Sequence, residues 1–146
     1  MKRLALAILL ATAAPAMTGC LGSKHSWAAQ PVATEETRIV PQEIYRRKNR
    51  LFVRVTFTNL SPSYLTVDRD AVTLQLDTGR ILGRSSGTTS LHKPYELPPN
   101  ASHSIYVDFK DEDIDEDRAA ANVIWTGAVF DGARQVQVPS TQVYAR

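Results

Sequence analysis

Cysteine and methionine are almost absent from this sequence, which has one cysteine and two methionines among 146 residues. One cysteine excludes an intramolecular disulfide framework. The methionines and the three histidines are too few and too scattered to form a copper or zinc site, which needs several ligands close together. The seven glycines form no loop of the kind that cradles phosphate. These absences leave no evident catalytic centre, and we expect a protein that is not an enzyme and has no cofactor or structural metal.

A strong excess of either charge is also missing. The sequence has 17 basic and 15 acidic residues. Lys2 and Arg3 belong to the N-terminal segment described next, and without them 15 residues of each sign remain. A domain without net positive charge has no electrostatic basis for binding a phosphate backbone. We therefore expect no nucleic-acid partner.

An export signal occupies the N-terminus. Lys2 and Arg3 precede the apolar run 4–14 and a stretch of small residues, which is the order of a secretory signal. The run is shorter than the roughly 20 residues of a transmembrane helix. The closing sequence MTGC (17–20) resembles the lipobox of bacterial lipoproteins. The alternative is an ordinary secretory signal that happens to precede a cysteine.

The lipobox resemblance implies that residues 1–19 are cleaved and that Cys20 becomes the lipidated N-terminus, carrying diacylglycerol and an acyl chain such as palmitate. Two or more acyl chains anchor a protein stably, whereas one binds only marginally. The mature chain would hold no methionine and no free thiol, which disfavours thiol catalysis. Leu21, not aspartate, follows the cysteine. In a diderm bacterium this resembles lipoproteins of the outer membrane, so the expected location is the cell envelope, at the periplasmic face of that membrane or the cell surface.

The segment after the cysteine shows neither a strand nor a helix period. We predict that residues 20–36 comprise the lipidated cysteine and a flexible tether, followed by one domain over 37–146. Sixteen residues of flexible chain span about 20–24 Å. Trp27 is expected to be a loosely packed tether residue, with a place at the membrane interface as the alternative.

From residue 37 onward, apolar and polar residues alternate with a period of two, which predicts half-buried strands. Leu51, Val53, Val55 and Phe57 form the clearest set, and Phe52, which breaks it, is expected to pack under a loop. Turn sequences such as Asp131-Gly132 separate the runs. Seven or eight short strands favour an antiparallel β-sandwich. We expect them near 38–45, 50–59, 63–68, 71–77, 80–84, 102–110, 121–130 and 133–139.

Two stretches add a resemblance. They are YLTVDRDAVTLQLDTGR (64–80) and LPPNASHSIYVDF (97–109). Their arrangement resembles the immunoglobulin-like domains of small bacterial lipoproteins, many of unknown function, over about residues 50–110. Pro99-Asn100 stands where those families usually have Pro-Gly, and asparagine also tolerates the left-handed region. The resemblance implies an immunoglobulin-like sandwich and carries no catalytic residues.

An acidic run covers residues 108–117. The spacing of Asp111, Asp113, Asp115 and Asp117 imitates the start of a calcium loop, but an EF-hand needs glycine and glutamate where Glu116 and Asn122 stand. We expect a solvated loop, with weak divalent-cation binding as the alternative.

A basic turn at 46–50 is the counterpart of the acidic run. Its simplest interpretation is a charged edge that deters strand pairing. An up-and-down strand count places the loops 46–49, 69–70, 85–101 and 131–132 at one end of the sandwich. The same count places 60–62, 77–80 and 110–121 at the other end, where the tether enters. Long loops on a rigid scaffold often carry binding sites. The expected partner surface is therefore at the basic end and comprises Arg46, Arg47, Lys48, Arg84, His92, Lys93 and Tyr95.

Taken together, these features predict a non-enzymatic, membrane-anchored envelope lipoprotein that binds a protein partner through a loop end or a sheet edge. The alternative is an envelope lipoprotein that binds an ion through residues 108–117 or an acidic glycan through residues 46–50. A small hydrolase with an unrecognised site is the third possibility.

Overall fold

Thirteen β-strands and one 3-10 turn form the secondary structure of residues 24–85, 93–114 and 120–146, which the computed structural model describes. Among these residues no helix is long and apolar enough to cross a membrane. The elements are β1 (Lys24–Ala29), β2 (Val32–Ala33), β3 (Thr37–Arg47), β4 (Arg50–Asn59), β5 (Leu65–Val67), η1 (Arg69–Ala71), β6 (Thr73–Leu76), β7 (Ile81–Leu82), β8 (Tyr95–Leu97), β9 (Ser102–Lys110), β10 (Ala120–Ile124), β11 (Val129–Asp131), β12 (Arg134–Gln135) and β13 (Thr141–Ala145).

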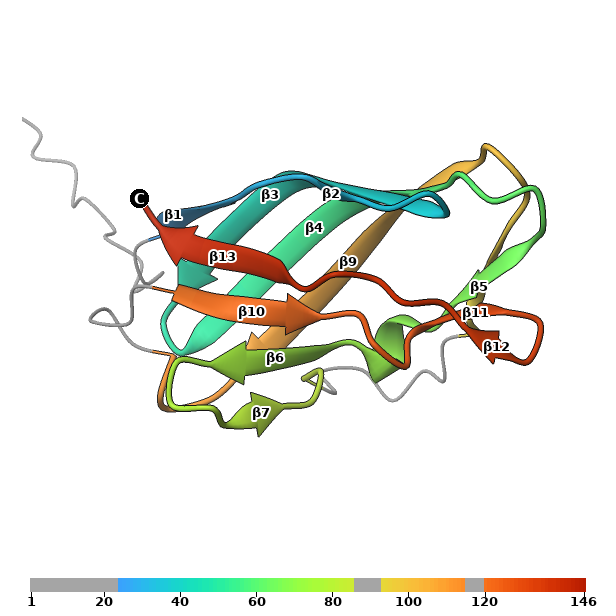
Figure 1. The fold of residues 1–146 in the computed structure, drawn as a ribbon. Helices are drawn as coiled ribbons and strands as arrows, with labels where there is room; N and C mark the ends of the chain where they lie inside the picture. Colours follow the sequence, from blue (N-terminus) through green and yellow to red (C-terminus); the bar gives the residue numbers. More distant parts are fainter. Residues whose placement is uncertain (1–23, 86–92, 115–119) are drawn as a thin grey trace, which may run out of the picture.

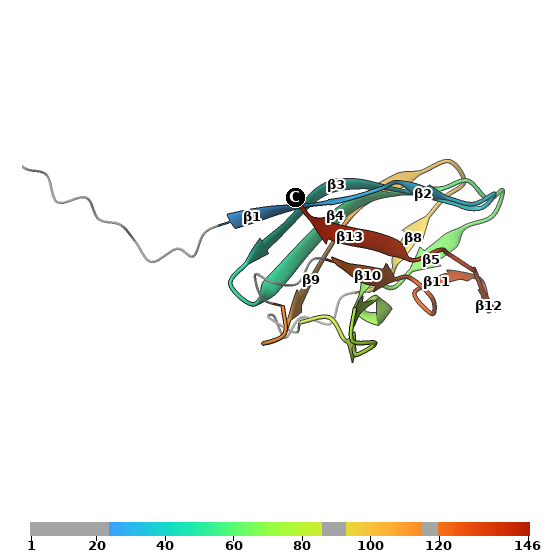
Figure 2. The same ribbon diagram turned by 60° about the vertical axis from the view of Figure 1, so that its left-hand side comes forward.

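The strands form a two-layered antiparallel sandwich, as the sequence predicts. The larger sheet has the order β7-β6-β10-β13-β1-β3-β4-β9, with β2 beside β3, and the smaller sheet has the order β12-β11-β5-β8. In Figures 1 and 2, β6, β10 and β13 lie in one layer and β3, β4 and β9 in the other. Strand β1 pairs with both β13 and β3 and so joins the layers. The backbone N–H of Ser85, after β7, donates to the carbonyl of Asp108 on β9 at 2.8 Å, which brings the sheet's two outer strands together.

The central strands match the predicted pattern closely. Strands β4 and β9 coincide with the predicted strands 50–59 and 102–110 within one residue. Leu51, Val53, Val55 and Phe57 are buried, as their alternation requires. The register of β3 against β4 shifts between Pro41 and Glu43, a bulge that accommodates a proline inside a paired strand.

Three predicted turns are confirmed by their backbone geometry. Gly79 has φ +83° between β6 and β7, and Gly132 has φ +57° between β11 and β12. Asn100 has φ 62°, so it adopts the left-handed conformation expected where related turns use glycine. Strands β11 and β12 pair across Asp131 and Arg134, which confirms the Asp131-Gly132 hairpin.

The prediction of one strand over 121–130 is wrong. Strand β10 ends at Ile124, the N–H of Ala128 donates to the carbonyl of Trp125 at 3.0 Å, and β11 starts at Val129 in the other sheet. Gly127, with φ +83°, permits this reversal. The apolar run therefore crosses from one sheet to the other. The short strands β8 and β13 were not predicted as strands either, because runs of three and five residues carry little periodicity.

The prediction of a flexible tether through residue 36 is also wrong. Residues 24–29 form β1, which pairs with β13 at Trp27–Ala145 and with β3 at Trp27–Ile44. The Trp27 side chain is only 5% exposed and belongs to the core. Residues 32–33 form β2 against β3. Strand β1 is held mainly by backbone pairing on both sides and contributes only one large apolar side chain. It therefore shows no alternating pattern by which the sequence would predict it.

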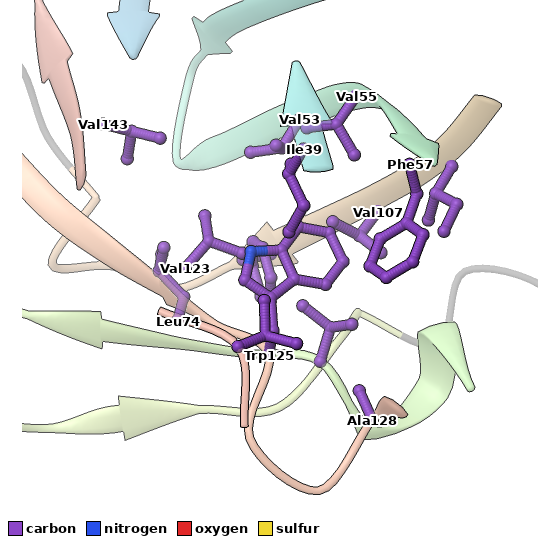
Figure 3. Close-up of a cluster of buried hydrophobic side chains, with 14 of the residues drawn as sticks. Ile39, Val53, Val55, Phe57, Leu74, Val107, Val123, Trp125, Ala128 and Val143 are labelled. Carbon is purple, nitrogen blue, oxygen red and sulfur yellow. The ribbon is translucent and has the colours of Figure 1, made fainter. Parts of the chain in front are cut away.

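Trp125 occupies the centre of the core between the layers, surrounded by side chains from β3, β4, β6, β9 and β10 (Figure 3). Its ring centroid lies 6.2 Å from that of Phe57 on β4. The indole N–H donates to the hydroxyl of Thr141 at 3.0 Å, so the buried polar atom is satisfied. Trp125 thus ties β4 to the start of β13.

The packing of β1 leads to the first prediction. Trp27→Ala should lower the free energy of unfolding by about 3–5 kcal/mol, the usual cost of emptying a buried tryptophan site. Urea denaturation of the purified protein measures this change. Ser26→Ala is the matched control, because Ser26 is an exposed residue of the same strand, and it should change stability by less than about 0.5 kcal/mol. Equal stability of both variants would contradict a packed β1.

Candidate functional site

The sandwich has two ends that differ in composition. The first, which we call the Lys24 end, holds the start of β1, the β3–β4 turn at 48–49, the β6–β7 turn and the loop after β9. The second, which we call the Asn59 end, holds the loops 60–64 and 98–101 and the β11–β12 hairpin. In Figure 1 the Lys24 end lies on the left, next to the C-terminus, and the Asn59 end on the right.

The basic turn and the acidic loop both lie at the Lys24 end, although they were predicted to lie at opposite ends. Arg50 pairs with Lys110 across β4 and β9. The N–H of Asp111 donates to the carbonyl of Asn49 at 3.1 Å. Arg80 reaches from the β6–β7 turn to the carboxylate of Asp111 at 2.6 Å and to that of Asp113 at 2.8 Å. The charges therefore form one mixed cluster instead of two poles.

The strand count failed because residues 63–77 make one traverse of the sandwich instead of two. Strand β5 lies in the smaller sheet, η1 bends the chain, and β6 continues in the same direction into the larger sheet (Figure 1). The carboxylate of Asp68 accepts from the N–H of Asp70 at 2.9 Å and caps the bend. The sequence Asp-Arg-Asp thus forms a bend instead of the predicted reversal, and the later turns 77–80 and 131–132 lie at the ends opposite to those predicted.

Arg46 has a structural position within the basic turn. It is 5% exposed, and its guanidinium donates to the carbonyl of Lys48 at 2.9 Å. That bond supports Lys48, which has φ 53° at the tip of the hairpin. Lys48 is exposed and Arg47 half-buried. Of the three basic residues predicted to bind a partner here, only Arg47 and Lys48 present a charge to solvent.

The other predicted partner residues lie elsewhere. Arg84 forms an ion pair with Asp70 beside η1, and Tyr95 packs its ring 4.2 Å from that of His103. Lys93 is exposed next to the smaller sheet. His92 lies outside the described residues. The described members of the predicted set therefore do not form one continuous surface.

Arg80 pairs with both described carboxylates of the predicted cation site, Asp111 and Asp113. Asp111 additionally accepts from the N–H of Asp113 at 3.0 Å. Asp115 and Asp117 lie outside the described residues. Within the described ranges, no group of three or more His, Cys, Asp or Glu side chains is arranged to hold a metal ion.

One motif was missed in the sequence. Residues Gly83 to Gly87 fit the pattern Gly-x-Ser-x-Gly, in which a nucleophilic serine sits on a strand-to-helix turn. Here Ser85 follows the two-residue strand β7 in an all-β fold, and its N–H is bonded to β9. The described part of the motif therefore lacks the strand-to-helix context that gives the pattern its meaning.

An aromatic row on the outer face of β3, β4 and β9 was also not predicted. The rings of Tyr45 and Phe52 stack at 4.6 Å, and those of Phe52 and Tyr106 lie 6.1 Å apart. The ammonium of Lys24 lies 4.0 Å from the centre of the Tyr45 ring, and Arg50 lies 5.9 Å from that of Phe52. Phe52 thus packs in this row and not under a loop. Cross-strand pairing places these residues together, and no single-strand pattern reveals it.

Asn59 organises the opposite end. Its side chain is buried and its amide donates to the carbonyls of Ser63 at 2.8 Å and Leu97 at 2.9 Å. Its amide oxygen accepts from the N–H of Ser61 at 2.8 Å. Its backbone exchanges bonds with Asn100 and Ala101, each 2.9 Å long. One residue therefore fixes both loops of the Asn59 end.

A polar cluster extends this end to the β11–β12 hairpin. Arg134 contacts the carboxylates of Glu36 and of Asp131, the latter at 2.9 Å. The Ser63 hydroxyl donates to Asp131 at 3.0 Å. The hydrogen bonds from Arg134 and then Ser63 lower the pKa of the Asp131 carboxyl, so it stays ionised in this cluster. Three separate segments are thus held together around one guanidinium.

Comparison with known proteins adds information on the fold. No family model and no curated protein matches the sequence. A conserved hypothetical protein from Bacillus anthracis has a similar structure, with a TM-score of 0.50 and 10% identity over 84% of this chain and 100% of that chain. The yjhA protein from Bacillus subtilis has a TM-score of 0.49 and 10% identity over 64% of this chain and 76% of that chain. The structural neighbours are thus bacterial proteins with a β-rich fold, and at this identity the likeness concerns the fold alone.

The second prediction concerns Asn59. Asn59→Ala leaves two carbonyls and one N–H without their partner in a buried position, so stability should fall by about 2–4 kcal/mol. Urea denaturation measures the loss. Asn122→Ala, a half-buried position on β10, serves as control and should cost less than about 1 kcal/mol. A similar small loss in both variants would show that Asn59 does not organise this end.

The third prediction concerns the aromatic row. Tyr106 is 39% exposed, and the partial desolvation of its phenol raises its pKa to about 12, with nearby Tyr45 and Asp108 adding to the rise. In the unfolded chain the phenol ionises near its ordinary pKa of about 10, so ionisation favours unfolding above that pH. Stability should therefore fall as the pH rises from about 10 towards 12, and less so in Tyr106→Phe.

Ultraviolet titration of tyrosinate checks this directly. The wild-type protein should show a late-ionising tyrosine that Tyr106→Phe removes. Tyr64→Phe, a change at a tyrosine that is 62% exposed, should leave the late phase in place. If the late phase were lost in Tyr64→Phe and kept in Tyr106→Phe, the assignment of the raised pKa to Tyr106 would be wrong.

Proposed function

We propose that this protein is a non-enzymatic lipoprotein of the bacterial envelope, anchored through lipid on Cys20, which binds a protein partner through its Asn59 end. The observation that carries the proposal is the placement of β1. Because β1 begins at Lys24, the chain from Cys20 joins the sandwich at the Lys24 end. An anchor at that point leaves the opposite end directed away from the membrane.

The composition of the Asn59 end supports a binding role. Its loops are pinned by Asn59 and by the Arg134 cluster, and rigidly held loops are where scaffolds of this kind usually bind. Tyr64, in the loop before β5, is 62% exposed. Tyrosine and arginine are the residue types enriched at the energetic centres of protein interfaces. Tyr64 and Arg134 therefore form a suitable pair of anchors for a partner.

The fourth prediction tests the partner in cells. A photocrosslinking residue at position 64 should capture one protein reproducibly, identified by mass spectrometry, and Arg134→Ala should abolish the capture. The same crosslinker at Ile81 is the matched control, because Ile81 is similarly exposed, at 61%, but lies on β7 at the edge of the larger sheet. Capture of the same proteins from both positions would argue against a site at the Asn59 end.

The anchor has its own control in the same cells. Cys20→Ser should abolish the incorporation of labelled palmitate and release the protein from the membrane fraction. Capture from position 64 should then fall, because the protein no longer lies beside its partner. Palmitate incorporation that survives the substitution would refute lipidation at Cys20.

A further inference from the structure

The two outer faces of the sandwich differ in the side chains that they present. On the strands β6, β10 and β13, the outward residues are all uncharged, as at the paired positions Gln75, Asn122 and Gln142. On the layer of β3, β4 and β9 (Figure 1), the outward residues include the exposed arginines Arg38 and Arg54. The charged groups of the sheet faces are therefore gathered on one side of the molecule.

The carboxylates of this charged face are occupied. Lys24 contacts Glu43, and the guanidinium of Arg50 lies 3.1 Å from the carboxylate of Asp108. The acidic run 111–117 follows β9 at the Lys24 end, so its charge opposes the basic residues there. The cations that remain for a ligand are thus those farther along the strands, away from that end.

Arg38 and Arg54 are these cations, and neither forms an ion pair with a described carboxylate. Glu43 lies opposite Arg54 in the strand register, but its carboxylate contacts Lys24. In the turn 34–36 before Arg38, Glu36 contacts Arg134 and Glu35 is exposed. The two guanidiniums are therefore available to an anionic group.

A row of hydroxyl side chains lies between the two arginines. The Nε of Arg54 donates to the hydroxyl of Ser104 at 3.0 Å, which holds the guanidinium against the sheet and leaves its terminal amino groups without a described partner. The hydroxyls of Thr58 and Ser102 lie 2.8 Å apart across the same two strands. Arg38 stands opposite Thr58. Since Thr58 is four residues from Arg54, the two arginines lie about 14 Å apart along the strands.

This arrangement suits a polymer that carries both carboxylates and hydroxyls. An arginine fork binds a carboxylate with two parallel hydrogen bonds. Serine and threonine hydroxyls both donate and accept, so they match the hydroxyls of a sugar. Tyr106, opposite Arg54 and 39% exposed, adds a ring with an apolar body. Between the arginines the face offers no large apolar side chain of the kind that anchors a protein partner.

We propose that the outer face of β3, β4 and β9 binds a linear, carboxylate-bearing polysaccharide that runs along the strands from Arg54 to Arg38. Arg54 is the principal contact, because Ser104 fixes its guanidinium. Arg38 binds a second carboxylate farther along the chain, and the hydroxyl row contacts the sugar between them. This site lies on a sheet face and is separate from the proposed protein site at the Asn59 end.

Fluorescence anisotropy tests the class of ligand. The full-length protein in neutral detergent should bind a labelled oligogalacturonate, and the affinity should fall as salt screens the charges. Dextran of the same length lacks carboxylates and polyglutamate lacks sugars, so each should bind at least about tenfold more weakly. Absence of oligogalacturonate binding would overturn the proposal. Equal binding of dextran would remove the role of charge, and equal binding of polyglutamate would indicate an acidic protein as the ligand; either result overturns the proposal.

A matched pair of variants tests the location. Thr56→Glu adds a negative charge between the two arginines and should weaken oligogalacturonate binding about tenfold. Gln142→Glu adds the same charge at an exposed strand residue of the uncharged face, where screening should keep the change below about twofold. Equal losses in the two variants would overturn the assignment to this face.

Arg54→Gln tests the principal contact. Glutamine keeps a polar side chain beside Ser104 but lacks the fork, so affinity should fall about tenfold while the thermal midpoint stays close to that of the wild type. Unchanged affinity would overturn the role of Arg54. Cys20→Ser should bind the oligogalacturonate as the wild type does, because the site does not require the lipid. A failure of the proposed anchor therefore leaves this test intact.

Discussion

The two-sided backbone pairing of β1 is the interaction on which the rest of this structure depends. Strand β1 bonds to β13 on one side and to β3 on the other, and in the strand order of the described residues it connects the two layers. It also contributes the buried side chain of Trp27 to the hydrophobic core. Without it, β13 and β3 would each present an unpaired edge, which proteins generally avoid. The same strand decides where the chain from Cys20 meets the domain. The pairing of β1 therefore also determines which end of the domain lies nearest the proposed anchor.

The two ends follow from this arrangement. At the Lys24 end, long β3, β4 and β9 strands finish together, and their side chains combine cations, compensated carboxylates and stacked aromatics. At the Asn59 end, short strands of the smaller sheet meet loops that a single buried amide holds in place. The two ends therefore differ in the side chains and loops that they present. The proposed anchor and the proposed binding site then occupy opposite ends of one rigid domain.

The sequence allowed the fold class, the longest central strands and the main turns to be predicted, because these features are local. The alternation in β4 and the turn residues Gly79 and Asn100 can be recognised from a few neighbouring positions in the sequence. The site could not be predicted in the same way. Strand β1 is stabilised by partners from both ends of the chain, and the bend at η1 looks like a reversal in sequence. That bend alone was enough to separate the basic turn and acidic loop in the prediction, although Arg80 and Asn49 bring them together.

Amide hydrogen exchange over β1 in the lipidated protein tests the central claim most directly. If β1 is paired on both sides, the amides of residues 25–29 that bond to β3 and β13 should be protected to a degree comparable with β4, since both would open only with the sheet. Exchange of these amides at the rate of an unstructured peptide, with β4 still protected, would contradict the account. The segment would then be a tether, and the distance between Cys20 and the domain would no longer fix which end faces the membrane.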